Sequence, residues 1–167
     1  MVDVILVNGK DEQIGTQEKM QAHVNGNLHR AFSVLLYNSK REMLIHKRAS
    51  SKYHCPRLWT NACCSHPMPN ETRGEAAKRR LFEELGYGDI ELKEVYTFTY
   101  KAKFDNGLTE HEIDTVFKGI TDINPPKIDP EEIKEFKWIA IKDLQKDMIE
   151  HPDKYTIWFK EMMRTQH

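Results

Sequence analysis

Residues 71–87 read Glu-Thr-Arg-Gly-Glu-Ala-Ala-Lys-Arg-Arg-Leu-Phe-Glu-Glu-Leu-Gly-Tyr, and this stretch is the clearest helix in the chain. Ala77, Leu81 and Leu85 recur every four residues, so they share one face of a helix. Gly86 follows directly and suits the residue that ends a helix. The spacing therefore predicts an amphipathic helix over residues 71–85.

The charged residues of this helix follow a longer pattern. Glu71 stands eight residues before Arg79, and Arg80 lies one helical turn from Glu84, with Glu83 adjacent. Ordinary ion pairs on a solvated helix would explain some of these charges. Their order nevertheless resembles the Nudix box, G-x5-E-x7-R-E-U-x-E-E-x-G-U with U aliphatic or aromatic, in which glutamates hold Mg²⁺ against a diphosphate.

Two positions depart from that box. Ser65 stands where the box has glycine, and Arg80 replaces the glutamate after the arginine. The exchange of a carboxylate for a cation weakens a site for several Mg²⁺ ions, but one Mg²⁺ held by Glu84 and the diphosphate is still allowed. Arg80 can also contact phosphate oxygens itself. We therefore expect this helix to hold a diphosphate without hydrolysing it.

Residues 59–67, Trp-Thr-Asn-Ala-Cys-Cys-Ser-His-Pro, place two thiols and an imidazole within four residues. A free cysteine is most often a small buried hydrophobic residue. His66, together with a nearby metal, would make the local field positive and favour the thiolate of Cys64. Cys63 would face the opposite way in an extended segment, so we expect Cys63 to be structural and Cys55 to be incidental.

Three histidines and two glutamates form a candidate metal site: His23, His29, His66, Glu110 and Glu112. Residues two apart in a strand share a face, so the two glutamates point the same way. Imidazoles with carboxylates suit a divalent ion such as Zn or Mn. The chain has eight histidines and no local ligand motif, so scattered surface histidines are the alternative.

Two aromatic residues, Tyr100 and Trp158, are further candidates, although core packing is the usual role of such side chains. Tyr100 precedes a turn at residues 105–107, Asp-Asn-Gly. A three-residue loop places Tyr100 opposite Glu112, whereas a two-residue loop places Lys101 there. The pattern leaves both registers open.

Composition limits the class of protein. A chain of 167 residues suits one domain, residues 1–167. With 25 basic and 26 acidic residues, it has no global field that would favour nucleic acid or an anionic membrane. It has no apolar run of about 18 residues, and residues 1–9 lack a signal-peptide pattern. Three cysteines, two of them adjacent, make no disulfide framework, so we expect a reducing, cytoplasmic setting.

Hydrophobic periodicity predicts a single α/β (α+β) domain, with a mixed sheet flanked by helices. Strands are expected at residues 3–7, 13–15, 30–37, 42–48, 90–104, 108–120 and 135–141. Thr16 is expected to cap a short helical turn that holds Glu18 and Lys19, and further helices are expected at residues 71–85, 142–150 and 153–163. Residues 23–29 and 49–58 are expected to be loops.

Together these motifs resemble the type I isopentenyl diphosphate isomerases, enzymes of Nudix fold. The resemblance runs from residues 19–29 through Leu-His-Arg-Ala-Phe-Ser (28–33), residues 59–67, the altered Nudix helix and Glu-His-Glu (110–112), so it covers most of the chain. It implies a single Nudix-like domain. The implied reaction is a 1,3-allylic proton shift that converts isopentenyl to dimethylallyl diphosphate for isoprenoid biosynthesis.

The resemblance also implies roles for individual residues. One tightly bound divalent metal (Mn or Zn, with Mg as a third option) would be held by His23, His29, His66, Glu110 and Glu112. Cys64 and Glu112 would move protons, assisted by Tyr100. Glu84 would reach the Mg²⁺ that accompanies the substrate diphosphate, and the phosphates would be bound by Lys19, Arg48, Lys52 and Arg80. Trp158 would cover the hydrocarbon end. The expected partner is a small-molecule diphosphate bound by a monomer, without nucleic acid or membrane.

Two other classes of function are consistent with parts of the pattern. A Nudix pyrophosphohydrolase acting on a nucleoside diphosphate derivative would release phosphate or a monophosphate with Mg²⁺ alone and would not need Cys64. A non-catalytic module would use the histidines and cysteines as a structural zinc site, with Cys63 and Cys64 as ligands together, and chelation would unfold it.

Overall fold

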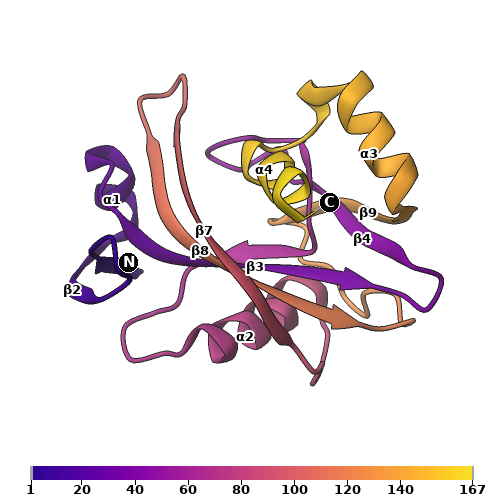
Figure 1. Ribbon diagram of the computed structural model, residues 1–167, viewed down its shortest axis with the longest axis horizontal. Helices are drawn as coiled ribbons and strands as arrows, with labels where there is room; N and C mark the ends of the chain where they lie inside the picture. The colour runs from indigo at the N-terminus through magenta and orange to yellow at the C-terminus, as the bar shows by residue number, and fades with distance from the viewer. Residues whose placement is uncertain (1, 167) are drawn as a thin grey trace.

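The computed structural model describes residues 2–166, and in this part of the chain nine strands form one mixed sheet with four α-helices around it (Figure 1). This confirms the expected fold class. The strands are β1 (Asp3–Val7), β2 (Gln13–Glu18), β3 (His29–Tyr37), β4 (Glu42–Arg48), β5 (Trp59–Thr60), β6 (Cys63–Ser65), β7 (Lys93–Lys103), β8 (Thr109–Ile120) and β9 (Ile133–Ala140). The helices are α1 (Lys19–Asn25), α2 (Arg73–Leu85), α3 (Ile141–Glu150) and α4 (Ile157–Gln166), with a 3₁₀ turn at Pro152–Lys154.

Strand β3 lies at the centre of the sheet. It pairs in parallel with β8, residues 29–37 against 112–120, and antiparallel with β6, residues 32–34 against 63–65. Phe32, Val34 and Leu36 pack in one core with α2, whereas Leu35 and Tyr37 pack in a second core with α3 and α4. Figure 1 shows α2 on one side of the sheet and α3 and α4 on the other. The chain therefore forms three layers, helix, sheet and helix.

The expected helix over residues 71–85 is confirmed as α2, with a start two residues later. Thr72 is its N-cap, and Thr72 and Glu75 form a capping box. Glu71 therefore lies before the first turn. At the other end, Gly86 adopts a left-handed conformation (φ 75°) and its N–H donates to the last turn.

The expected cap at Thr16 is wrong. Thr16 lies within β2, and the carboxylate of Glu18 accepts hydrogen bonds from the amides of Met20 and Gln21 to begin α1. An acidic side chain is favourable at a helix N-terminus because the free amides there carry partial positive charge. As a result His23 lies on a helix rather than in the loop expected for residues 23–29.

The other expected elements are present with shifted ends. The β7–β8 turn is the three-residue alternative, since the Phe104 amide donates to the Leu108 carbonyl (2.8 Å) around Asp-Asn-Gly. Strand β7 begins at residue 93 rather than 90. Helix α4 begins at residue 157 rather than 153, because residues 152–154 form a 3₁₀ turn.

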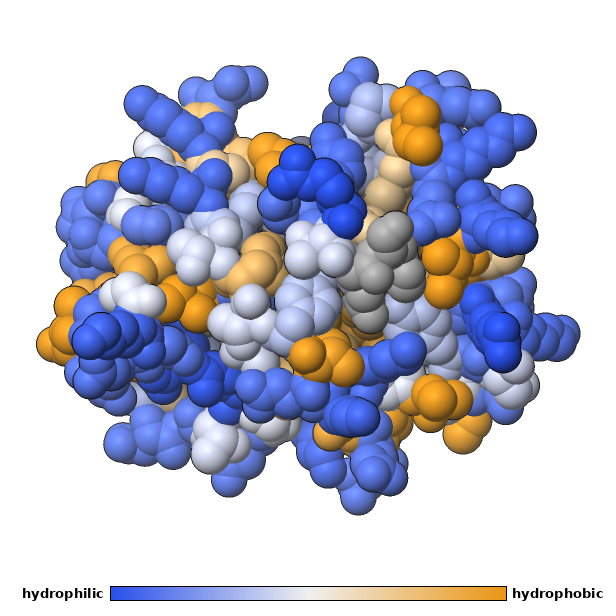
Figure 2. Space-filling model, in the orientation of Figure 1, coloured by the Kyte–Doolittle hydropathy of each residue, from blue (hydrophilic) through white to orange (hydrophobic). Residues whose placement is uncertain are grey.

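On the face in Figure 2, hydrophobic residues occur in separate patches between hydrophilic ones. Among the described residues, none of the helices has the length and apolar character needed to cross a bilayer.

Candidate functional site

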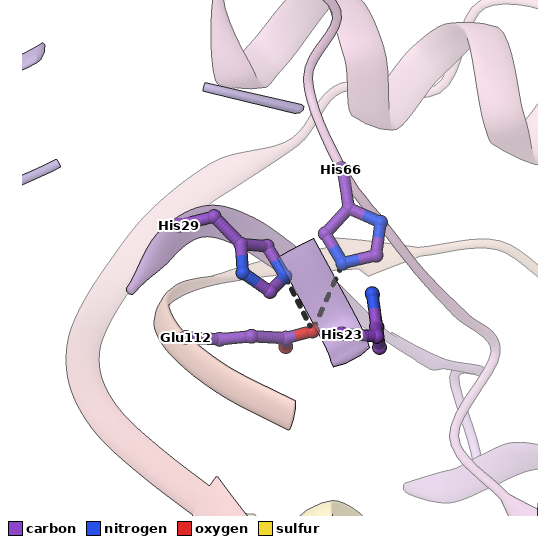
Figure 3. Close-up of side chains that lie close together, drawn as sticks. All are labelled: His23, His29, His66 and Glu112. Carbon is purple, nitrogen blue, oxygen red and sulfur yellow. Dashed lines mark hydrogen bonds and ion pairs between the residues drawn. The ribbon is translucent and has the colours of Figure 1, made fainter. Parts of the chain in front are cut away.

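Four side chains from four segments converge at one end of the sheet. His23 comes from α1, His29 from the start of β3, His66 from the residue after β6, and Glu112 from β8. One ligand atom of each lies within 4.8 Å of the others. Figure 3 shows the rings of His29 and His66 turned toward the same carboxylate oxygen of Glu112. The measured separations from that oxygen are 3.3 Å for His29 Nε2 and 2.9 Å for His66 Nε2.

Backbone carbonyls fix the tautomers of two of these histidines. His23 Nδ1 donates to the Lys19 carbonyl (2.7 Å), and His29 Nδ1 donates to the Asn27 carbonyl (2.8 Å). In the neutral ring each Nε2 is then a lone-pair donor. These Nε2 atoms are buried and have no hydrogen-bond partner within the described residues. An imidazole lone pair and a nearby carboxylate repel each other unless a cation lies between them. The cluster therefore fits a divalent ion.

Glu112 keeps its charge in this cluster. Burial acts to raise its pKa, but the adjacent His66 and His29 hold the pKa well below its usual range. A carboxylate with three imidazoles is a donor set typical of Zn and Mn sites. The cluster therefore contains four of the five expected metal ligands.

Glu110 lies outside this four-residue cluster, although it lines the same pocket. Its Oε1 accepts a hydrogen bond from Nε2 of His54, a buried residue of the 49–58 loop. His54 Nδ1 in turn lies 3.3 Å from Arg48 Nη2, which can only donate. Arg48 therefore fixes the His54 tautomer that donates to Glu110.

A pocket opens beside the cluster and brings together ten of the thirteen expected site residues: Lys19, Arg48, Lys52, Cys64, His66, Arg80, Glu84, Glu110, Glu112 and Trp158. The other three are not among the residues that line it. His23 and His29 belong to the cluster, and Tyr100 packs in the same core as Cys64 and Trp158. Residues that are far apart in sequence thus share one cavity.

Cys64 lies on β6 directly opposite Ser33 of β3. Its Sγ is 3.2 Å from Ser33 Oγ and donates to Asn61 Oδ1 at 3.0 Å. The expectation that His66 with a nearby metal favours the Cys64 thiolate depends on that metal and stays a prediction. Burial and the nearby Asp114 act to raise the pKa of Cys64 well above its ordinary value.

Cys63 is structural, as expected, and packs in the core on the α2 side of the sheet. It has one polar contact as well, because its thiol donates to Glu84 Oε2 at 3.0 Å. Glu84 also accepts from Arg80 Nη2 (2.7 Å), one helical turn earlier. The carboxylate of the altered Nudix helix is therefore held at the pocket by a thiol and a guanidinium.

The four expected phosphate-binding cations are engaged by protein groups. Arg80 contacts Glu83, Glu84 and Glu132, and Lys52 Nζ contacts Glu132 at 2.7 Å. Lys19 Nζ lies over the Tyr53 ring, 5.3 Å from its centre. The Arg48 guanidinium donates to backbone carbonyls of the 49–58 loop and lies 5.2 Å from the centre of the Trp158 ring. A diphosphate would have to replace some of these contacts.

Trp158 extends from α4 into the pocket and is 5% exposed. Its Nε1–H donates to Thr60 Oγ1 at 3.0 Å, which fixes the plane of the ring. Arg48 on one side shows that this ring already accommodates a cation.

Four pocket-region residues were not foreseen from the sequence: Ser33, His54, Asp114 and Glu132. Asp114 extends the alternation of Glu110 and Glu112 along β8, so a signal for it existed in the two-residue period. It is buried, and burial raises its pKa well above the usual range, with Ser33 Oγ donating to it at 2.8 Å. Ser33 belongs to the 28–33 motif, but the motif gave it no role, and no local pattern marks His54 or Glu132.

Comparison with known proteins places the chain in a family. The NUDIX domain model matches residues 27–159. An isopentenyl-diphosphate Delta-isomerase of Pectobacterium atrosepticum is 42% identical over 96% of this chain and 88% of its own length. A second one, isopentenyl-diphosphate Delta-isomerase 2 of Aromatoleum aromaticum, is 44% identical over 93% of this chain and 81% of its own length.

Solved structures show the same fold at lower identity. DR0079 from Deinococcus radiodurans superposes with a TM-score of 0.81 at 19% identity, over 98% of each chain. The E. coli dihydroneopterin triphosphate pyrophosphohydrolase has a TM-score of 0.61 at 16% identity, over 81% of this chain and 92% of its own. Fold, site and sequence relatives agree: the chain belongs to the isopentenyl-diphosphate Delta-isomerase family of NUDIX-domain proteins.

Proposed function

We propose that this chain converts isopentenyl diphosphate to dimethylallyl diphosphate by a 1,3-allylic proton shift and so supplies isoprenoid biosynthesis. The observation that carries the proposal is the meeting of Cys64 and Glu112 in one pocket, with a metal-ligand cluster at one side and cations at the other. The names of the relatives support the same activity.

Two protons move in this reaction. One of Cys64 and Glu112 delivers a proton to the terminal CH₂ carbon of the alkene, which leaves positive charge on the tertiary carbon. The other removes a proton from the neighbouring CH₂ on the diphosphate side, and the electron pair of that bond forms the new double bond. An unactivated alkene is a weak base, so a positioned acid and a positioned base are both needed.

His23, His29, His66 and Glu112 would hold the tightly bound divalent ion, Mn or Zn with Mg as a third option, and Glu110 would join them from beside the cluster. When bound, this ion supplies a positive charge that tunes the Glu112 carboxyl and orients the Tyr100 hydroxyl. Tyr100 would assist Glu112 as a proton donor.

At the other side of the pocket, Glu84 would hold the Mg²⁺ that accompanies the substrate. Lys19, Arg48, Lys52 and Arg80 would bind the phosphate oxygens, as charge-assisted hydrogen bonds to phosphate are among the stronger polar contacts in proteins. The absence of a glutamate at position 80 leaves the helix with fewer metal ligands than the hydrolytic box has.

Trp158 would cover the hydrocarbon end. An aromatic face stabilises a nearby cation, here the tertiary carbocation. The same ring would also keep water away, which would otherwise trap the carbocation as an alcohol. The ring is held in place by Thr60, so it offers a fixed apolar wall to the substrate.

We further propose that residues 1–167 act as one domain and as a monomer, in the reducing cytoplasm. Cys55, Cys63 and Cys64 are free thiols, and a reducing compartment preserves a catalytic thiol.

The alternatives fit less well. A pyrophosphohydrolase would give Cys64 no role, and the curated relatives are named as isomerases. A structural zinc site that used both Cys63 and Cys64 would need them on one side, but they pack in different cores.

The decisive experiment follows isopentenyl diphosphate in deuterated water. We expect dimethylallyl diphosphate that carries deuterium, with no phosphate released. Cys64→Ala should lose this activity while it keeps the fold and the metal content, and Cys55→Ala serves as the matched free-thiol control. Release of phosphate by the wild type, or full activity of Cys64→Ala, would contradict the proposal.

A further inference from the structure

We propose that Glu132 is a second carboxylate ligand for the magnesium that accompanies the diphosphate, beside Glu84. It would replace, from a separate loop, the carboxylate that the helix lacks at Arg80. This inference rests on the proposed function, because it concerns the diphosphate side of the same pocket.

The backbone holds Glu132 at a fixed place relative to Glu84. The segment before β9 docks on the end of α2: the Lys127 amide donates to the Leu85 carbonyl (3.2 Å), and the Asp129 amide donates to the Glu84 carbonyl (2.9 Å). From the other side, the Ala49 amide donates to the carbonyl of Glu132 itself (3.0 Å). The Glu132 side chain is thus directed from a segment tied to α2 and to the 49–58 loop.

The carboxylates of Glu84 and Glu132 both contact the same nitrogen atom of Arg80. Nη2 of Arg80 lies 2.7 Å from Glu84 Oε1 and 3.4 Å from Glu132 Oε1. The other oxygen of Glu132 accepts from Lys52 Nζ at 2.7 Å. A positive charge therefore already lies between Glu84 and Glu132, at a position that both carboxylates line in the pocket.

Binding of a diphosphate changes the charge balance there. Lys52 and Arg80 are two of the cations that would bind phosphate, and Glu132 contacts both. If the phosphates take these cations, Glu84 and Glu132 are left as partly desolvated carboxylates without a cation beside them, which is unfavourable. Mg²⁺ is commonly held by one or two carboxylates together with substrate phosphates. The ion that arrives with the diphosphate would satisfy both carboxylates.

If Glu132 were a competitor of phosphate and not a metal ligand, its removal would have the opposite effect on diphosphate binding. If Glu132 only neutralised Lys52 and Arg80, it would compete with phosphate, and its removal would strengthen diphosphate binding whether or not Mg²⁺ is present. The response of binding to Mg²⁺ therefore separates a ligand from a competitor.

The test measures binding of inorganic pyrophosphate to the full chain by calorimetry, with and without Mg²⁺. Glu132→Gln keeps the size of the side chain and an acceptor for Lys52, but it removes the charge. We expect it to weaken pyrophosphate binding about tenfold or more in saturating Mg²⁺, a loss of the size seen when metal-site partners are removed. Without Mg²⁺ it should bind pyrophosphate at least as tightly as the wild type.

Glu135→Gln is the matched control, because Glu135 lies on β9 with a side chain 55% exposed and contacts only Lys47 at 3.9 Å among the basic groups of the described residues. It should leave both measurements unchanged. Equal or tighter binding by Glu132→Gln in Mg²⁺ would overturn the role of Glu132 alone. Failure of the wild type to bind pyrophosphate would instead overturn the diphosphate site, and the inference with it.

Discussion

Tyr100 and Glu112 lie directly opposite each other across the antiparallel β7–β8 pair. Directly opposed residues in such a pair have side chains on the same face. The Tyr100 hydroxyl is buried and has no hydrogen-bond partner within residues 2–166. Burial, with Glu110 and Glu112 nearby, raises its pKa, so the phenol keeps its proton. A buried hydroxyl that keeps its proton and has no partner among these residues suits a proton donor that acts when substrate is bound.

Tyr100→Phe should therefore lower kcat while it leaves the protein at least as stable. We expect a loss of about 10²-fold, at the lower end of the range for a positioned proton donor. Removal of an unpartnered buried hydroxyl does not break a hydrogen bond, so the free energy of unfolding should not fall. Tyr96→Phe is the control on the same strand, since the Tyr96 hydroxyl donates to the Met162 carbonyl (3.3 Å). A parallel loss of stability and activity in Tyr100→Phe would indicate a structural role only.

The contact between His54 and Glu110 predicts an effect on metal binding. His54→Ala leaves the buried Glu110 carboxylate without its imidazole donor. Loss of such an outer partner typically weakens metal affinity about 10–100-fold, which a competitive titration against a chelator measures without any assay of activity.

Two controls make this prediction specific. His151→Ala removes a histidine whose residue is exposed and should not change the affinity. In a Glu110→Gln background, His54→Ala should cost little more, because its effect acts through that carboxylate. An undiminished metal affinity in His54→Ala would show that Glu110 does not contribute to the metal site.

Much of the fold follows from periodicity and turn chemistry. The β3–β4 hairpin and the β7–β8 hairpin alternate clearly, and α2 has both an apolar stripe and a glycine at its end, so local preference and tertiary packing agree there. A short helical turn at Lys19 was expected, but its extent as α1 was not, because its cap is a glutamate rather than the expected threonine. The very short β5 and β6 exist only through pairing with β4 and β3, which no local pattern encodes.

The site residues also divide into those that a sequence motif marks and those that only the fold brings to the pocket. Residues that belong to a motif, such as Cys64, His66 and Glu84, could be named from the sequence. Glu132 could not, because it reaches the pocket through the docking of a loop on α2. The upward shift of the Cys64 pKa was also beyond the sequence, since it depends on burial and on Asp114 from another strand.

Gly86 controls the docking of that loop. It has a positive φ of 75°, and a Cβ there would lie 2.7 Å from the backbone nitrogen of Lys127. Gly86→Ala must therefore bear the cost of a left-handed residue, about 1–2 kcal/mol, and also displace the segment that carries Glu132. Urea unfolding should show a loss greater than the conformational cost alone.

Gly26 offers a matched comparison for this prediction. It ends α1 with φ 68°, but a Cβ there would meet Thr109 Cγ2 at 3.4 Å, which is an ordinary contact. Gly26→Ala should show the conformational cost alone, and only Gly86→Ala should also weaken Mg²⁺-dependent binding of pyrophosphate. Equal losses of stability in the two variants would argue against the close approach of Lys127.

His46 predicts a dependence of stability on pH. Burial, together with the nearby Arg48, lowers its pKa to about 3 in the folded protein. The contact between His46 Nδ1 and the Ala62 carbonyl oxygen (3.1 Å) acts in the other direction but is outweighed. In the unfolded chain a histidine has a pKa of about 6.5. Above that pH neither state is protonated at His46. As the pH falls from 6.5 toward 3, only the unfolded state takes up this proton, so stability falls by up to about 1.4 kcal/mol per pH unit.

His46→Asn keeps an N–H for the Ala62 carbonyl and removes the proton site. Urea unfolding at pH 7.5, 6 and 5 should show the variant losing less stability than the wild type as the pH is lowered, whereas two parallel curves would mean that His46 does not stay neutral in the fold.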